Sequence, residues 1–334
     1  MEPRRFELTA SPHIKAPDST PKIMWSVVAS LVPVFAAAVW WFGPSAVLVV
    51  TAATLGCVVT ERAFGPGGTL RDGSATITGI LLGLTLPPGL PMWMAFVGGV
   101  IAIGLGKLVF GGLGQNVFNP ALLGRAMLQA AFPEDLTTWP APVERWAQLR
   151  GDNFALPFMS ADPVAGVTGA TPLGQMKFEQ IPTETIDLFL GATSGSTGET
   201  AAAAILVGGL YLALRGHLNW RIPVSILLTV GSLSQLIHAV APERYPDAVF
   251  MLFSGGLMLG AWYMATDMVT SPTTNLGCWV FGLGIGTLVV VIRFWGGLPE
   301  GVMYSILLMN AMVPFINRAT QPRVFGTGRE VHAP

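Results

Sequence analysis

Long apolar stretches recur along the chain and are separated by short polar segments. An α-helix needs about 20 predominantly apolar residues to cross a bilayer. Ten stretches approach that length: 23–42, 45–60, 74–88, 92–110, 118–132, 199–215, 222–241, 247–265, 276–293 and 299–317. Two of them, 74–88 and 118–132, are short and interrupted by glycine or proline, which is typical of broken helices. The pattern predicts an all-α polytopic membrane protein with about ten transmembrane helices.

The ten stretches form two groups of five, separated by a polar segment too hydrophilic to span a membrane. An odd number of spans in the first group makes the second group enter the bilayer from the opposite side. This arrangement predicts a 5+5 inverted repeat, a fold that places ligands between its halves. The predicted regions are a cytoplasmic N-terminal segment, a first transmembrane half, an extracytoplasmic loop, a second transmembrane half and a cytoplasmic tail: 1–22, 23–132, 133–198, 199–317 and 318–334.

The composition indicates that most of the chain is surrounded by membrane lipid. Hydrophobic residues make up 51% of the chain and charged residues only 11%, whereas charged residues make up about 25% of an average soluble domain. The 40 glycines and 10 tryptophans suit closely packed helices and interfacial anchoring. A net charge of −1 gives no field that would attract phosphates, so nucleic acid is excluded as a partner.

The basic residues predict the orientation of the chain in the membrane. With a cytoplasmic N-terminus, 12 of the 18 lysines and arginines, Lys107 among them, fall in cytoplasmic segments and five fall outside, while Arg125 lies within a span. This bias follows the positive-inside rule. Both termini are therefore expected in the cytoplasm, and the loop 133–198 is expected on the other side.

Catalytic and metal-binding patterns are missing from the sequence. Cys57 and Cys278 are the only cysteines, and each lies in an apolar stretch. Two thiols cannot hold an iron–sulfur cluster, and no cysteine or histidine spacing suits zinc. No catalytic triad is visible. We expect no metal and no catalytic residues of the chain's own.

The external loop contains a hydroxyl between small residues, in the segment Thr168-Gly169-Ala170-Thr171-Pro172-Leu173. Small neighbours make such a hydroxyl accessible to a modifying enzyme. The alternative is an ordinary turn, and Gly-Ala-Thr occurs again at 191–193.

A second polar segment, 111–120, lies at membrane depth. The amides of Asn116 and Asn119 could hydrogen-bond a planar heterocycle, with Phe118 nearby for stacking. Equally, Asn119 could cap the helix that starts at Pro120.

Three further segments place polar groups near span ends. Asp267 is followed by several hydroxyls, among them Thr270 and Thr273, and an acid near the membrane indicates a functional pocket. Residues 72–79 could line a cavity or cap a helix. Ser196 and Glu199 have the spacing of a capping box, which would explain Glu199 without a functional role.

Together with three shorter motifs, these segments form an ordered set along the chain. The set is Ser11-Pro12-His13, 72–75, 111–121, 168–173, 198–200, Trp220-Arg221-Ile222-Pro223 and 265–274. It resembles the RnfD family, a membrane component of the Rnf ion-translocating ferredoxin:NAD oxidoreductase complex. The membrane subunit designated B in the sodium-translocating NADH:quinone reductase belongs to a related family. The resemblance extends from near residue 11 to near residue 323.

The resemblance implies that Thr171 carries FMN through a phosphoester bond, with Thr168, Gly169 and Ala170 completing the attachment motif. A separate Mg-dependent flavin transferase would install the group from FAD on the outer face of the membrane. The charge count places Thr171 on that face by an independent argument. One position departs from the usual motif, because Ala165 stands where an aspartate is common.

The resemblance also implies a second, non-covalent flavin of the riboflavin type within the bundle. The two polar segments on the cytoplasmic side supply the candidate contacts: Asn116, Phe118, Asn119, Asp267, Thr270 and Thr273.

The implied function is that of a membrane subunit in the bacterial inner membrane. It would carry electrons through covalent FMN and couple this transfer to Na⁺ or H⁺ translocation. Its partners would be other subunits of an Rnf-type complex, including another flavin-bearing subunit and iron–sulfur subunits. Composition and topology alone favour a different class, a solute channel or secondary transporter with inverted repeats. A cofactor-free scaffold is a third possibility, in which every motif is a cap or a turn.

Overall fold

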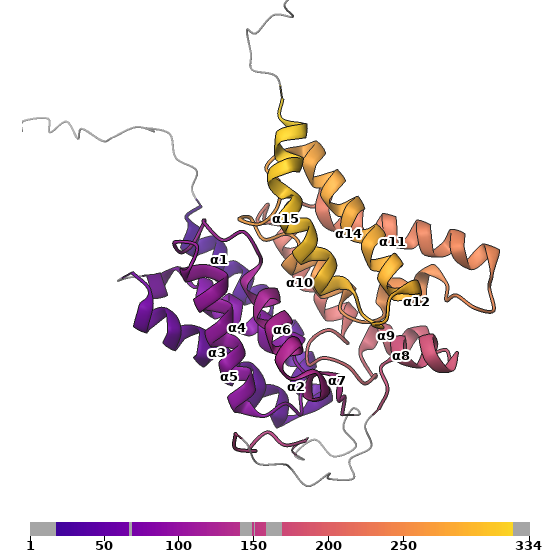
Figure 1. Cartoon of the computed structure of the whole chain (residues 1–334), viewed down its shortest axis with the longest axis horizontal. Coiled ribbons are helices and arrows are strands. Elements are labelled where there is room, and N and C mark those ends of the chain that lie inside the picture. Colours follow the sequence, from indigo (N-terminus) through magenta and orange to yellow (C-terminus); the bar gives the residue numbers. More distant parts are fainter. Residues whose placement is uncertain (1–17, 67–68, 141–148, 150, 158–168, 323–334) are drawn as a thin grey trace, which may run out of the picture.

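The computed structural model describes residues 18–66, 69–140, 149, 151–157 and 169–322. Within these ranges the chain is helical and contains no strand. Thr168 and Ala165 lie outside the described residues, as do the first 17 positions and the tail from 323. Figure 1 shows the two halves of the chain as neighbouring helical bundles, the first in indigo to magenta and the second in orange to yellow.

The described part of the first half contains six α-helices. Pro33 lies in the first turn of the second of them, where a missing N–H costs nothing, and the preceding helix ends just before it. The helices are Thr20–Ser30 (α1), Val32–Phe42 (α2), Pro44–Phe64 (α3), Ser74–Thr85 (α4), Met92–Ile103 (α5), which continues as the π-helix Gly104–Leu108, and Pro120–Ala131 (α6). A short 3₁₀ turn, Thr69–Asp72, precedes α4.

The loop and the second half contain the remaining helices. The loop contributes Pro133–Thr137 (α7), Pro172–Gly174 (α8), which continues as the π-helix Gln175–Glu179, and Thr185–Leu190 (α9). The second half contributes Ala202–Leu214 (α10), Arg221–Val240 (α11), Ala248–Phe253 (α12), Leu257–Leu259 (α13) with the π-helix Gly260–Met264, Asn275–Trp295 (α14) and Val302–Thr320 (α15).

Every predicted span corresponds to helix in the structure, and the polytopic membrane fold is confirmed. Within the described residues, five helical stretches are long and apolar enough to cross a membrane by themselves: Thr20–Phe42, Pro44–Phe64, Arg221–Val240, Asn275–Trp295 and Val302–Thr320. The others are shorter or interrupted. The helix α4 ends at Thr85, before Pro87 and Pro88, and the stretch 247–265 is broken at Ser254 to Gly256.

Helix packing follows the same order in both halves. In the first half α3 packs along α5, and α5 packs along α6; in the second half α11 packs along α14, and α14 packs along α15. These pairs are the second with the fourth span and the fourth with the fifth span of each half. Figure 1 also shows that the start of α1 and the end of α15 face one end of the molecule, while α7, α8 and α9 lie toward the other. The shared packing order agrees with the predicted repeat, and the loop helices lie away from the start of α1 and the end of α15.

Glycines bring the backbones of the main helix pair into direct contact. A Cβ at Gly99 of α5 would collide with the carbonyl oxygen of Ala53 in α3, and a Cβ at Gly56 of α3 would collide with the carbonyl oxygen of Phe96. Small residues at such crossings let membrane helices gain close van der Waals packing, since lipid offers no hydrophobic driving force.

Substituting Gly99 tests this contact. We expect Gly99→Ala to destabilise the protein by about 1–3 kcal/mol, because the added methyl group meets backbone that cannot move aside. Gly104→Ala is the matched control, since no atom lies within 4 Å of its Cβ position. Thermal melting in detergent, followed by size-exclusion chromatography, measures both. Equal melting temperatures for the two variants would contradict the proposed packing.

Candidate functional site

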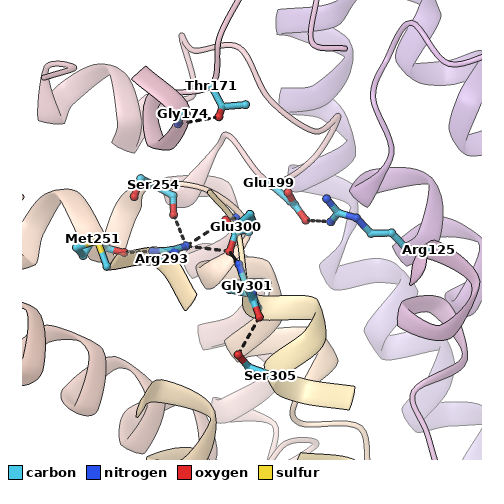
Figure 2. A network of polar contacts seen from close by, with 12 residues as sticks. Arg125, Thr171, Gly174, Glu199, Met251, Ser254, Arg293, Glu300, Gly301 and Ser305 are labelled. Atoms are coloured by element: carbon cyan, nitrogen blue, oxygen red, sulfur yellow. Dashed lines mark hydrogen bonds and ion pairs between the residues drawn. The ribbon is translucent and has the colours of Figure 1, made fainter. Parts of the chain in front are cut away.

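A cavity of about 370 Å³ lies beneath the loop segment that carries Thr171. Its walls come from both halves and from the loop. Arg125 on α6 belongs to the first half, whereas Glu199, before α10, and Glu300, before α15, belong to the second. Figure 2 shows these side chains on the same side of Thr171. We call this the outer cavity.

Local sequence explains the conformation of Thr171. Pro172 begins α8, and Thr171 occupies the N-cap position in an extended conformation. Its Oγ1 accepts a hydrogen bond from the backbone N–H of Gly174 at 3.2 Å (Figure 2). The side chain is half-buried and lines the outer cavity, so its hydroxyl is within reach of a group placed there.

The residues before Thr171 are held against the loop. The N–H of Gly169 donates to the carbonyl of Trp139 at 2.9 Å, and a Cβ at Gly169 would collide with Oγ of Ser194. A larger residue at position 169 would therefore require the Ser194 side chain to move. Ala170 is exposed and also lines the cavity.

A buried ion pair joins the two halves at the cavity wall. Nη1 of Arg125 lies 2.6 Å from Oε1 of Glu199, and the two side chains are only 10% and 9% exposed. The capping-box interpretation of Glu199 is wrong, because α10 begins at Ala202 and is not capped by Ser196. The carboxylate instead compensates the one arginine that the charge count left inside a span.

A second ion pair, between Arg293 and Glu300, is bonded to the backbone of Ser254 and Gly256. Nη2 of Arg293 lies 3.1 Å from Oε2 of Glu300 and also donates to the carbonyl of Ser254 at 2.9 Å. The same carboxylate accepts from the N–H of Gly256 at 3.0 Å, and Figure 2 illustrates the surrounding network. The outer cavity thus has Arg125, Glu199 and Glu300 in its wall and Arg293 behind it, held in two arginine–glutamate pairs.

A smaller cavity of about 100 Å³ lies near the other end of α6. Three of the predicted ligand residues line it, namely Asn116, Asn119 and Asp267. From the second half, α10 and the residues after it, the π-helix Gly260–Met264 and the segment after that helix contribute to the wall. We call this the inner cavity.

Asn119 caps a helix and contacts the inner cavity at the same time. Its Oδ1 accepts from the N–H groups of Ala121 and Leu122 at 3.0 and 3.3 Å, which confirms the capping interpretation. Its Nδ2 donates to the carbonyl of Met264 at 3.1 Å. The residue therefore links the two halves, and only one amide hydrogen remains for a ligand.

The other predicted ligand residues have separate roles. Asp267 accepts hydrogen bonds from the hydroxyl of Thr270 at 3.0 Å and from the N–H of Val269 at 3.3 Å. Thr273 bonds to Asn317 on α15, at 3.0 Å from its backbone N–H. Phe118, Thr270 and Thr273 do not belong to the lining of the inner cavity.

Sequence reasoning missed a buried charge network at the inner cavity. Nζ of Lys107 lies 2.7 Å from Oε1 of Glu61 and 2.6 Å from Oγ of Ser74, and the lysine and glutamate side chains are 3% and 0% exposed. The charge count placed Lys107 in a cytoplasmic segment, but the π-helix at the end of α5 turns it inward.

The segment 72–79 fits both of its interpretations. Oδ1 of Asp72 accepts from the N–H and from the hydroxyl of Ser74, at the start of α4. Ser74 and Thr78 also line the inner cavity. The same residues therefore satisfy the helix start and contribute polar groups to the wall.

Metal ligands are not grouped in the part of the chain that the structure describes. No cluster of three or more His, Cys, Asp or Glu side chains that could hold a metal ion occurs there. Cys57 and Cys278 are both buried free thiols.

Comparison with known proteins fits this geometry. The family described as NQR2, RnfD, RnfE matches residues 7–326. The chain belongs to this family. The matched range includes every motif that carries the resemblance in the sequence and all residues that line the two cavities.

Three relatives illustrate the similarity along the whole chain, and each is the subunit designated D of its complex. The chain is 42% identical to that of the proton-translocating ferredoxin:NAD(+) oxidoreductase complex of Clostridium ljungdahlii, covering 97% of each chain. It is 41% identical to that of the ion-translocating oxidoreductase complex of Stutzerimonas stutzeri, covering 92% of each. It is 38% identical to that of the Na(+)-translocating ferredoxin:NAD(+) oxidoreductase complex of Acetobacterium woodii, covering 98% of this chain and 97% of the relative.

Removing one partner of the Arg125–Glu199 ion pair should lower the stability of the protein. We expect Arg125→Met to lower the free energy of unfolding by about 3–5 kcal/mol, because Glu199 then stays buried without a counter-charge. Adding Glu199→Gln to this variant should restore much of the lost stability. Gln129→Met, also on α6, is the control for a change in the cavity lining. A melting temperature of Arg125→Met equal to that of the control would show that the pair does not join the halves.

Proposed function

We propose that the protein is a membrane subunit of an ion-translocating oxidoreductase complex and carries electrons through FMN attached to Thr171. The observation that carries this proposal is the position of Thr171, whose hydroxyl borders the outer cavity. The relatives' names, which describe subunits of such complexes, support the choice of function class. The solute-channel alternative has no comparable support.

The outer cavity fits a flavin in size and chemistry. Its volume of about 370 Å³ is in the usual range for small-molecule pockets. A phosphoester at Thr171 would keep the oxygen that accepts from Gly174 N–H. FMN supplies the redox chemistry when bound, and the protein supplies position and electrostatics. Arg125 and Glu199 are two of the charged groups in the wall that would tune it.

The proposed partner subunits would supply the iron–sulfur clusters that this chain, with two cysteines, cannot bind. Two buried cysteines cannot ligate an iron–sulfur cluster, so we propose that electrons reach and leave the flavin through iron–sulfur subunits and another flavin-bearing subunit. A flavin transferase would attach FMN from the outer side of the bacterial inner membrane, with both termini of the chain in the cytoplasm. The relatives' names include both proton and sodium translocation, and we propose coupling to one of these ions.

We propose that a second, non-covalent flavin of the riboflavin type binds at the inner cavity, whose volume of about 100 Å³ is below that of usual small-molecule pockets, so that its wall must widen to admit the ring. Asn116, Asn119 and Asp267 supply polar groups at its wall. Thr270 would act through Asp267, whose carboxylate it orients by a hydrogen bond. The remaining candidates, Phe118 and Thr273, would affect such a ligand only indirectly.

Replacing the attachment residue tests the main proposal. When the chain is produced together with a flavin transferase, a denaturing gel under ultraviolet light should show flavin fluorescence at the position of the 35.3 kDa chain. We expect Thr171→Ala to abolish this signal, because it removes the oxygen that forms the ester. Thr193→Ala is the matched control, since it alters the second Gly-Ala-Thr of the chain. Fluorescence that persists in Thr171→Ala, or is lost in Thr193→Ala alone, would refute attachment at Thr171.

The second flavin has its own test. We expect Asn116→Ala and Asp267→Ala to weaken retention of extractable, non-covalent flavin about tenfold, because each removes a polar contact from the inner cavity. Thr273→Ala, outside that cavity, should retain it. Chromatography of the flavin released from the purified complex measures the amount of non-covalent flavin per protein. An unchanged riboflavin content in both inner-cavity variants would contradict the proposed second flavin. It would not affect the proposed attachment of FMN to Thr171.

A further inference from the structure

Lys177 makes an unusual set of contacts for a loop lysine. It lies in the π-helix Gln175–Glu179, which directly continues α8. Its Nζ donates to three backbone carbonyls, those of Gly296 at 2.6 Å, Leu298 at 2.9 Å and Ile292 at 3.3 Å. An ammonium group has three hydrogens, so these contacts use its full capacity.

One of the three carbonyls, that of Ile292, lies in the last turn of α14, which ends at Trp295, and it also accepts from the N–H of Gly296; the carbonyls of Gly296 and Leu298 follow the helix. The last carbonyls of a helix lack partners within the helix and carry partial negative charge. A lysine is well suited to satisfy them. Lys177 therefore binds the last turn of α14 and the chain that follows it, and it fixes its own helical segment to the end of a membrane-spanning helix.

A second contact holds the same segment. Leu173 is buried, and its Cδ1 would lie only 2.6 Å from a Cβ built at Gly255. Gly255 adopts a positive φ of 64°, and its neighbour Gly256 donates to Glu300. The segment that starts at Thr171 is thus attached to the second half at two points, one near its start and one near its end.

The segment from Pro172 to Glu179 is so short that it needs the second attachment, at Lys177. The α8 helix has three residues and its π continuation has five. A helix this short is marginal on its own, so tertiary contacts must hold it. Thr171 and Lys177 are six positions apart, about 9 Å along a helix. Movement of the segment at Lys177 would therefore be transmitted to the attachment oxygen.

We propose that Lys177 is a positioning residue for the group carried by Thr171. By binding the end of α14 and the chain that follows it, Lys177 fixes the attachment segment over the outer cavity, so that a tethered ring keeps one orientation relative to Arg125 and Glu199. This inference rests on the proposed flavin attachment at Thr171. Functional groups must be held within fractions of an ångström by the residues behind them, and a single ester link has rotatable bonds that cannot do this alone.

The test compares the mobility of the attached flavin among full-length variants, produced with a flavin transferase and reconstituted in lipid nanodiscs. Time-resolved fluorescence anisotropy measures flavin reorientation on the nanosecond timescale. We expect Lys177→Met to carry as much covalent flavin as the unmodified sequence, but with an amplitude of nanosecond reorientation about twofold larger. The reduction potential of the flavin should shift as well, because its distance to the charged wall is no longer fixed.

Two further variants separate positioning from general stability. Lys177→Arg retains cationic donors and should restore the low mobility in large part. Lys22→Met removes an exposed lysine paired with Asp18, in the first turn of α1, and should leave mobility unchanged.

Three results would count against the proposals. Unchanged anisotropy and potential in Lys177→Met, with only the melting temperature lowered, would overturn the positioning role. If Lys177→Met does not fold, an anisotropy of the unmodified sequence equal to that of a freely moving FMN-peptide would overturn it instead. Absence of covalent flavin in the unmodified sequence would refute the proposed function rather than this inference.

Discussion

The ion pair between Arg125 and Glu199 is the contact on which the arrangement of the two halves depends at the outer cavity. Each residue alone would be an uncompensated charge in a low-dielectric bundle, and such charges cost several kcal/mol. Paired at 2.6 Å, they join α6 of the first half to the segment before α10 of the second. The same pair forms part of the wall below Thr171, so the contact that joins the halves also shapes the candidate site.

The helix α6 connects both cavities. Its first residues, Pro120 and Ala121, line the inner cavity, whereas Arg125 and Gln129 line the outer one. Ala121 and Arg125 are about 6 Å apart along the helix axis. At the inner end Asn119 caps α6 and bonds to the second half, and at the outer end Arg125 does so through Glu199. One short helix therefore holds the interface at two depths and borders both proposed flavin positions.

Sequence patterns predicted the helices and the possible cap at Asn119, because hydropathy and helix-capping chemistry are local properties. They could not predict the partners of buried charges. Lys107 was placed in a cytoplasmic segment, since its pairing with Glu61 depends on a π-helix and on packing between α3 and α5. Glu199 fitted a capping box by spacing, but its partner lies 74 positions away. The contacts of Lys177 with α14 are equally non-local.

The central claim is that Thr171 carries a redox-active group on the outer side of the membrane. Mass spectrometry of the peptide that contains Thr171, taken from the protein purified with its partner subunits from its native host, tests this most directly. The account predicts a peptide heavier by FMN less one water, with the added mass localised to Thr171. An unmodified Thr171 in a complex that transfers electrons would contradict it.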